Sequence, residues 1–228
     1  MDLRQSIFAA AALFCAVPSV LSAQAPLAPQ PRFAVVLDAA HGGSDSGASL
    51  ATPGSAAQPE KSVTLALSVR LRSLLQARGI PVVTTRESDA SLDLDQRAQI
   101  ANRARAQACL SLHATQTGSG LHLYVSALTP TTPARFLPWK TAQSAFVQRS
   151  LDLAGVLNSA LTHAGFAVTL GRTALPAVDS MTCPAVAIEL APESAPNAAA
   201  PGDADYQARI AQALAAALVE WRSEANQP

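Results

Sequence analysis

Short apolar runs alternate with amphipathic stretches along this chain. Five runs are rich in branched residues and either continuous or alternating in hydrophobicity, which is typical of strands. They are residues 32–39, 80–86, 109–115, 121–127 and 184–190. Four longer stretches repeat apolar residues at helical spacing. They are residues 60–79, 92–108, 141–165 and 205–222. This order predicts one α/β domain with a mostly parallel central sheet and helices on both faces.

The first predicted helix has a distinct apolar face. Its members are Val63, Ala66, Leu67, Leu71, Leu74 and Leu75. Gly79 follows at the position where glycine commonly ends a helix. Residues 42–59, between the first predicted strand and this helix, are rich in Gly, Ser and Pro, so we expect a loop there.

The first 25 residues have the layout of a secretory signal peptide. Arg4 precedes an apolar run over residues 7–17, and small residues follow. The run is shorter than the roughly 20 residues of a membrane-spanning helix, so we expect cleavage and no integral membrane segment afterwards. A Pro-rich linker, residues 26–31, would then lead into a single domain over residues 32–228.

Composition narrows the possible functions. The 228 residues are 49% hydrophobic, which allows a sizeable core. Sixteen basic and sixteen acidic residues give no formal net charge, so we expect no nucleic-acid partner. Cleavage after the signal peptide would leave Cys109 and Cys183, which an exported protein can pair. Two buried thiols are an equally good interpretation.

Ionisable residues follow three of the predicted strands. His41 lies just beyond the first, His113 ends the third, and Glu189 ends the last. Ligands of open α/β sheets bind outside the carboxyl ends of the strands. Glu60, at the start of the first helix, can join them across the glycine-rich loop. Two histidines and a carboxylate with an open fourth position form a common catalytic zinc site, so we predict His41, Glu60 and His113 as ligands and Glu189 as general base.

Each of these residues also has a structural interpretation. A lone histidine in an apolar strand is more often a hydrogen-bonded core residue than a ligand, and Glu60 can simply favour a helix N-terminus. Arg86 and Asp89 can form an ion pair or hold a loop, and His122 has no predicted chemical partner. Glu189 is harder to explain in this way, because a carboxylate after a fully apolar strand must be paired, bound to metal or exposed. No dinucleotide, phosphate-binding or serine-hydrolase motif occurs.

Four segments together form the pattern of a known family. They are VVLDAAHGGSDSGA, EKSVTLALSVRLRSLLQARGIPVVTTRESD, LDLDQRAQIANRARAQACLSLHA and CPAVAIEL. In order and spacing, this pattern resembles the zinc-dependent N-acetylmuramoyl-L-alanine amidases, which hydrolyse the cell wall. The resemblance implies Zn²⁺ on His41, Glu60 and His113, with Glu189 as general acid/base on zinc-bound water. It also implies structural roles for Arg86, Arg97 and Asn102.

The resemblance further implies a function, namely hydrolysis of the amide bond between N-acetylmuramic acid and L-alanine in peptidoglycan. The predicted signal peptide indicates a secreted protein, and a single domain with no obvious anchoring module favours the periplasm. Residues 128–140 leave little room for the blocking insertion of some relatives, so no activator protein is expected. A zinc peptidase acting within the stem peptide and a non-catalytic peptidoglycan-binding relative are the alternatives.

Three short segments depart from the family pattern. Ala39 and Ala40 stand where the family usually has Pro-Gly, and Thr115 stands where it usually has Asn. The segment LAPESAPN follows Glu189 in place of the usual Gly-Phe and Ser-Asn. All four chemical residues are retained, so we expect the departures to affect substrate preference and rate.

Overall fold

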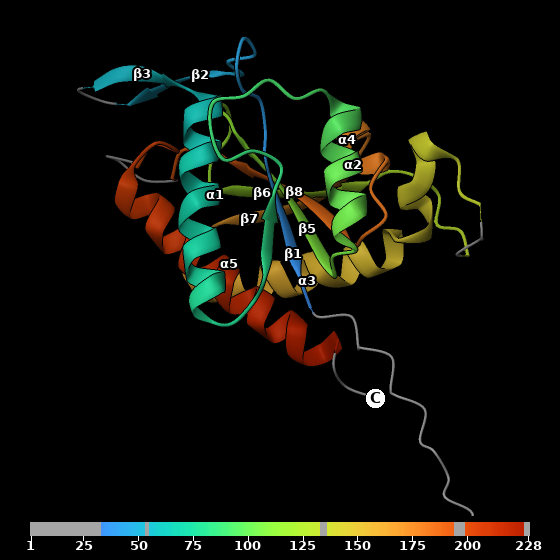
Figure 1. The fold of residues 1–228 in the computed structure, drawn as a ribbon. Coiled ribbons are helices and arrows are strands. Elements are labelled where there is room, and N and C mark those ends of the chain that lie inside the picture. The colour runs from blue at the N-terminus through green and yellow to red at the C-terminus, as the bar shows by residue number, and fades with distance from the viewer. Residues whose placement is uncertain (1–32, 53–54, 133–135, 194–198, 226–228) are drawn as a thin grey trace, which may run out of the picture. The chain divides into compact units, whose positions relative to one another are not determined.

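A six-stranded sheet forms the centre of the protein. The computed structural model describes residues 33–52, 55–132, 136–193 and 199–225. The strands are β1 (Val35–Ala39), β4 (Val82–Thr84), β5 (Ala108–Ala114), β6 (Leu121–Ser126), β7 (Val168–Thr173) and β8 (Ala185–Leu190). Their order is β4-β1-β5-β8-β6-β7 (Figure 1). The first four run parallel, whereas β6 is antiparallel to β8 and parallel to β7.

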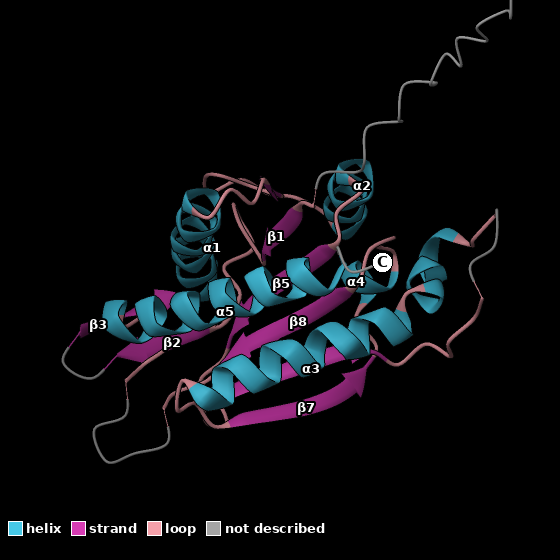
Figure 2. Ribbon diagram, turned by 90° about the horizontal axis from the view of Figure 1, so that it is seen from below, coloured by secondary structure: helices cyan, strands magenta, loops and turns pink. Residues whose placement is uncertain are grey.

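Helices cover both faces of this sheet. On one face lie α1 (Glu60–Ala77), α3 (Val147–His163) and α5 (Ala204–Ala225), of which α3 and α5 cross in front of the strands in Figure 2. Their apolar faces and the inward residues of the strands form the main core, which includes Trp221 of α5. The other face carries the shorter α2 (Leu94–Ala104) and α4 (Pro176–Asp179) over a smaller core. The mostly parallel α/β architecture predicted from the sequence is therefore confirmed.

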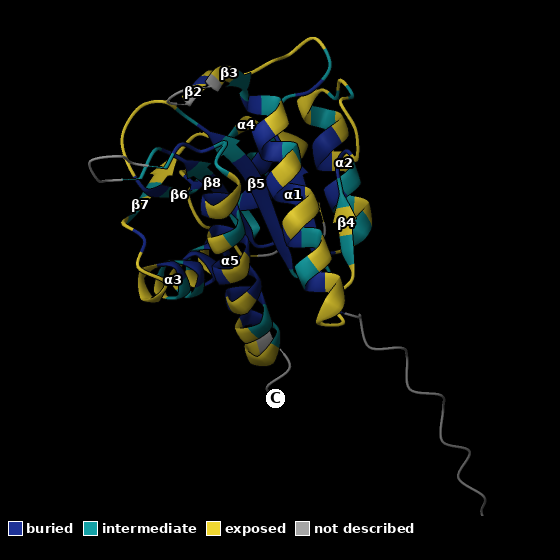
Figure 3. Ribbon diagram, turned by 90° about the vertical axis from the view of Figure 1, so that its left-hand side faces the viewer, coloured by how far each residue is buried: buried dark blue, intermediate teal, exposed yellow. Residues whose placement is uncertain are grey.

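The alternation of side chains along the strands separates the core from the site. Leu37, Leu110 and Ile188 belong to the main core, and the central strands are buried (Figure 3). Because strand side chains alternate between faces, the residues of opposite parity face α2 and α4. At the carboxyl ends of the strands, these residues are Asp38, Ser111, His113, Ala187 and Glu189. In β1, β5 and β8, one face of the sheet is thus apolar, and the other becomes polar where the strands end.

Two predicted segments have a different structure. The expected loop at 42–59 contains an antiparallel hairpin of β2 (Ser49–Thr52) and β3 (Ser55–Pro59). Among the described side chains of this hairpin, Leu50 is the buried apolar one. The hairpin sequence therefore lacks the alternation of apolar and polar residues that predicts a strand. The helix expected at 141–165 is broken at Phe146 (φ −117°, ψ −3°), which separates a 3₁₀ segment, Trp139–Ala145, from α3.

The sequence prediction also missed two elements and misplaced one side chain. β7 is an edge strand of mostly exposed residues, so it has no apolar run, and α4 is a single turn. Ala66 of α1 is exposed rather than part of the apolar face, while Leu67 and Leu71 are buried as predicted. The predicted signal peptide (1–25) and linker (26–31) lie outside the described residues and stay predictions. Among the helices within the described ranges, none combines the length and the hydrophobicity of a membrane-spanning segment.

Cys109 and Cys183 form a disulfide bond, which decides between the two interpretations of these residues. The bond joins the second residue of β5 to the segment just before β8, across 74 positions of sequence. Both residues are buried beneath α2 and α4. The disulfide therefore ties together the two neighbouring strands whose other ends carry His113 and Glu189.

Candidate metal centre

The chain turns sharply after β1, and this turn presents His41. Its backbone is left-handed (φ +61°), and the two glycines that follow also have positive φ. The N–H of Gly42 donates to the carbonyl of Asp45 at 2.8 Å, which closes a tight turn. Glycine accepts such φ values without steric cost, which explains the glycine-rich sequence after the strand.

Gly47 provides space for the site itself. Its φ is +63°, and a Cβ at this position would lie 2.6 Å from Oε2 of Glu60 and 2.7 Å from Cδ2 of His41. Cβ atoms essentially never make contacts this short, so a side chain at position 47 would require Glu60, His41 or the loop to shift. The glycine is therefore required by the close approach of the loop to Glu60 and His41.

Two buried arginines hold the end of β1. Arg86 donates to the carbonyl oxygens of Ala39 and Ala40 at 2.9 and 3.0 Å, and to that of Lys61 at 2.7 Å. Arg97 donates to the carbonyl oxygens of Ala39 and His41, both at 2.7 Å. Of the two roles predicted for Arg86, the structure shows that of holding the loop. These bonds fix the backbone from which His41 projects.

Asp89 and Asn102 also have structural roles. Asp89 accepts from the N–H of Gly43 and pairs with Nζ of Lys61, both at 2.7 Å, and the bonds from Lys61 and Gly43 lower the pKa of its carboxyl group. Asp89 thus joins the glycine turn to α1 rather than pairing with Arg86. Asn102 bonds the backbone of Ser180 and Thr182 after α4.

His41, Glu60 and His113 converge on one point. One ligand atom from each residue lies within 4.8 Å of the other two. Oε2 of Glu60 is 3.1 Å from Nε2 of His41, and Oε1 is 3.2 Å from Nδ1 of His113. Backbone N–H groups of Ala48 and Ala114 donate to the same two oxygens, both at 3.0 Å. The Glu60 carboxylate is therefore oriented by the backbone and lies between the two imidazoles.

The electrostatics of this group favour a charged carboxylate. Burial opposes ionisation of Glu60, but hydrogen bonds from His113, His41 and the backbone outweigh it and hold its pKa well below the ordinary value. The hydrogen bond with Glu60 raises the pKa of His41, although burial partly opposes this. Asp45, 2.8 Å from Nδ1 of His41, has a lowered pKa because of that contact. Negative charge is thus concentrated where a cation would be held.

The donor set suits a zinc ion. Two imidazole nitrogens and one carboxylate oxygen are a common protein ligand set for catalytic zinc, which leaves a fourth position for substrate or water. The Glu60 side chain is only 7% exposed, whereas those of His41 and His113 are 24% and 38% exposed. The group is therefore closed on the protein side and open on the other, as a catalytic site requires.

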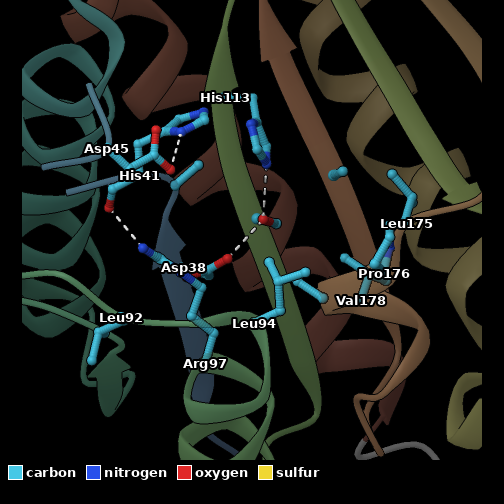
Figure 4. Close-up of a pocket in the computed structure, with 14 residues that line it drawn as sticks. Asp38, His41, Asp45, Leu92, Leu94, Arg97, His113, Leu175, Pro176 and Val178 are labelled. Atoms are coloured by element: carbon cyan, nitrogen blue, oxygen red, sulfur yellow. Dashed lines mark hydrogen bonds and ion pairs between the residues drawn. The ribbon is translucent and has the colours of Figure 1, made fainter. Parts of the chain in front are cut away.

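A cavity of about 220 Å³ adjoins this open side (Figure 4). Its polar lining comes from the strand ends, the loop after β1 and α2, and consists of Asp38, His41, Asp45, Arg97, Ser111 and His113. Most of its apolar lining comes from the start of α2, from α4 and from the residues just before them. These apolar residues are Leu92, Leu94, Leu175, Pro176, Ala177 and Val178, and Ala40 and Ala187 also line the cavity. The cavity beside the predicted ligands is therefore bounded on its apolar side by α2, α4 and the residues just before them.

Glu189 lies beside the group rather than within it. On β8 it is in parallel register with His113 of β5. The two residues line a second cavity, of about 370 Å³, together with Tyr124 and Thr173. Within the part of the chain that the structure describes, no hydrogen bond or ion pair engages the Glu189 side chain. The carboxylate is free to interact with a ligand.

Two residues that contact the histidines were not predicted from the sequence. Each lies at the outer ring nitrogen, the one that faces away from Glu60. Asp45 contacts Nδ1 of His41, and Ser111 lies 3.4 Å from Nε2 of His113. The signals were present, since Asp45 is four residues beyond His41 and Ser111 is two residues before His113 on the same face of β5. His122 contacts Thr169 on β7, in agreement with a structural role.

Comparison with known proteins identifies the family. The family model described as N-acetylmuramoyl-L-alanine amidase matches residues 35–220. The chain belongs to this amidase family. The matched region includes both histidines of the site, Glu60 and Glu189, so the family resemblance seen in the sequence is confirmed.

Individual relatives agree with the family assignment. The endolysin of Bacillus phage SPP1 is 33% identical over 147 residues, which are 63% of this chain and 52% of the endolysin. The amidase AmiA of Escherichia coli K12 is 40% identical over 80 residues, which are 35% of this chain and 26% of AmiA. The chain thus spans about half and a quarter of the lengths of these relatives.

Solved structures share the fold over most of the chain. The catalytic domain of CwlV, an N-acetylmuramoyl-L-alanine amidase from Bacillus (Paenibacillus) polymyxa, has a TM-score of 0.63 and 25% identity. The superposition covers 84% of this chain and 98% of the CwlV domain. The described α/β domain therefore has the fold of an amidase catalytic domain.

Proposed function

We propose that this protein is a zinc-dependent N-acetylmuramoyl-L-alanine amidase that acts on peptidoglycan. The observation that carries this proposal is the convergence of His41, Glu60 and His113 beside a cavity, in a chain of the amidase family. These three residues would hold the ion. When bound, Zn²⁺ supplies a Lewis acid that polarises a carbonyl group and lowers the pKa of a water molecule to about 7.

The remaining chemistry falls to Glu189. Its carboxylate would take a proton from the attacking water and return one to the leaving amine of L-alanine. The new C–O bond gives a free lactyl carboxyl group on N-acetylmuramic acid, and the broken C–N bond frees the stem peptide. The register of Glu189 with His113, its place in the adjoining cavity and its lack of a partner among the described residues support this role.

A Glu189→Gln variant tests this assignment. The amide keeps the size of the side chain but cannot act as a general base. We therefore expect the rate of peptidoglycan hydrolysis to fall by about 10²–10⁴-fold, with the zinc content of the protein unchanged. A matched control is Glu193→Gln, because Glu193 pairs with Arg209 at the surface. Full activity of the Glu189 variant would rule out the proposed role.

Product analysis separates this reaction from its alternatives. An amidase leaves free lactyl groups and peptides with an L-alanine amino terminus, whereas a peptidase cuts between stem-peptide residues. Retention of the zinc-loaded protein on peptidoglycan without release of products would indicate a wall-binding relative.

We also propose an export route and an open site. The predicted signal peptide supports secretion, and among such locations we favour the periplasm. Of the described residues in the segment 127–146, Trp139 and Lys140 contact Asp95 of α2, and none lines the two cavities at the site. A solved relative, the CwlD amidase of Clostridioides difficile, is in complex with the GerS lipoprotein. Activity of this protein without any partner would support an open site.

A further inference from the structure

The two ring nitrogens of His113 face different partners. Nδ1 is 3.2 Å from Oε1 of Glu60, on the side of the predicted metal. Nε2 is 3.4 Å from Oγ of Ser111, which lies one pleat back on the same face of β5. Oγ of Ser111 is in turn 2.8 Å from Oδ2 of Asp38 on β1. Ser111 and Asp38 are both buried. A series of hydrogen bonds therefore connects the Asp38 carboxylate in the sheet interior, through the Ser111 hydroxyl, to the His113 imidazole (Figure 4).

The partners of Asp38 determine the direction of these hydrogen bonds. Its Oδ1 accepts from Oγ1 of Thr85 and from Nη1 of Arg97, each at 2.8 Å. A carboxylate paired with a guanidinium only accepts hydrogen bonds, so the Ser111 hydroxyl must donate its one hydrogen to Oδ2. Its oxygen then has only lone pairs to offer His113.

The tautomer of His113 follows from this polarity. The bond between Ser111 and the imidazole is satisfied only when Nε2 carries a hydrogen and donates it. A neutral imidazole that is protonated on Nε2 has its free lone pair on Nδ1. In the metal-free structure Nδ1 lies within hydrogen-bond distance of Oε1 of Glu60, and with a metal bound the same nitrogen would present its lone pair to the ion instead.

We propose that Ser111 is a positioning residue. Asp38 orients the Ser111 hydroxyl, and this hydroxyl fixes the tautomer and ring orientation of His113. The inference rests on the proposed zinc function. His41 is arranged in the opposite sense, since Asp45 binds its Nδ1 and leaves Nε2 toward Glu60. One imidazole is held by an exposed carboxylate, and the other by a buried hydroxyl and carboxylate. Partners of this kind typically change metal affinity by about 10–100-fold when they are removed.

The test compares the zinc affinity of the purified full chain with that of three variants. Ser111→Ala removes the hydroxyl, and Ser111→Thr keeps it, with room for the extra methyl because position 111 borders the 220 Å³ cavity. Ser68→Ala is the matched control, since the Ser68 hydroxyl is buried in α1 without a hydrogen-bond partner among the described residues. Zinc affinity is measured by competition with a chelator, and folding by thermal melting of the metal-free proteins.

We expect Ser111→Ala to lose about 10–100-fold in zinc affinity, while Ser111→Thr and Ser68→Ala stay within a factor of about three of wild type. In ¹⁵N-labelled, zinc-loaded protein, the Nε2 hydrogen of His113 should exchange slowly in wild type and Ser111→Thr, and rapidly in Ser111→Ala. Equal affinity in all four proteins, or a protected Nε2 hydrogen in Ser111→Ala, would overturn the role of Ser111. A wild-type protein that binds no zinc would overturn the proposed function as well.

Discussion

At the residue scale, the site depends on backbone groups as much as on side chains. The carbonyl of Ala39 accepts from both buried arginines, and that of Ala40 accepts from Arg86 and Thr64. The acceptors in these bonds belong to the main chain, so the bonds do not require Pro-Gly at the two positions. The departure from the family pattern before His41 is therefore compatible with a well-held loop.

Gly47→Ala should disturb the site directly. The new Cβ would overlap Oε2 of Glu60, so we expect zinc affinity and peptidoglycan hydrolysis to fall at least about tenfold, as when a residue orienting a metal ligand is lost. Gly79→Ala is the matched control. Gly79 also has positive φ (+70°), but a Cβ added to it would have no neighbouring atom within 4 Å.

Both glycine variants should lose about 1 kcal/mol of unfolding free energy from the backbone conformation alone. Only Gly47→Ala should lose zinc, as measured by chelator competition on the two proteins. Similar zinc affinity in both would mean that the space at position 47 is not needed.

The gathering of His41, Glu60, His113 and Glu189 at one edge of the sheet could be predicted from the sequence, because each stands at or just beyond the end of a strongly apolar strand or at the start of a helix. Asp45 and Ser111 were not predicted, because short polar residues in a loop or strand have many structural roles. Only their contacts with the outer ring nitrogens distinguish them.

At the element scale, the strands and helices that build the main core were predictable, and the elements that shape the site were less so. The main-core elements bury continuous apolar faces, which produce regular patterns in the sequence. The β2–β3 hairpin, β7 and α4 bury few side chains and have no such pattern. The elements with the weakest sequence signal include α4, which forms much of the apolar wall beside the predicted zinc ligands.

Ala177→Trp tests whether α4 forms part of the substrate site. Ala177 is half-buried and lines the 220 Å³ cavity, so an indole there should occupy the space needed by substrate. We expect kcat/KM on peptidoglycan to fall at least about tenfold, equivalent to about 1.4 kcal/mol of transition-state binding. Zinc affinity should not change, because the predicted ligands lie on other elements.

Val69→Trp is a suitable control for added aromatic bulk, since Val69 is exposed on α1 and lines neither cavity at the site. Unchanged kcat/KM in the Ala177 variant would show that substrate does not enter this cavity.

At the scale of the whole molecule, the sheet register brings the site residues together, and the disulfide stabilises the strands that carry two of them. Parallel pairing places His113 beside Glu189, and the Cys109–Cys183 bond joins the same two strands near their other ends. The spacing of the two cysteines left their pairing open. The disulfide can form because β5 and β8 are neighbours in the sheet, and sequence patterns do not determine the order of strands.

Replacement of both cysteines by alanine should lower the unfolding free energy by about 2–4 kcal/mol, as expected for a cross-link over a long loop. Urea unfolding of the variant and of wild type measures this difference. Zinc affinity should be retained under native conditions, because neither cysteine contacts the ligands. An unchanged unfolding free energy would mean that the disulfide does not contribute to stability.

The proposed zinc centre is tested by the zinc content of the purified protein and by the response of its activity to chelation. We predict one zinc per wild-type chain, loss of peptidoglycan hydrolysis when a chelator removes it, and recovery when zinc is restored. His113→Ala should bind no stoichiometric zinc and should not recover. Full hydrolysis by the metal-free protein, or stoichiometric zinc in the His113 variant, would contradict the proposed centre of His41, Glu60 and His113.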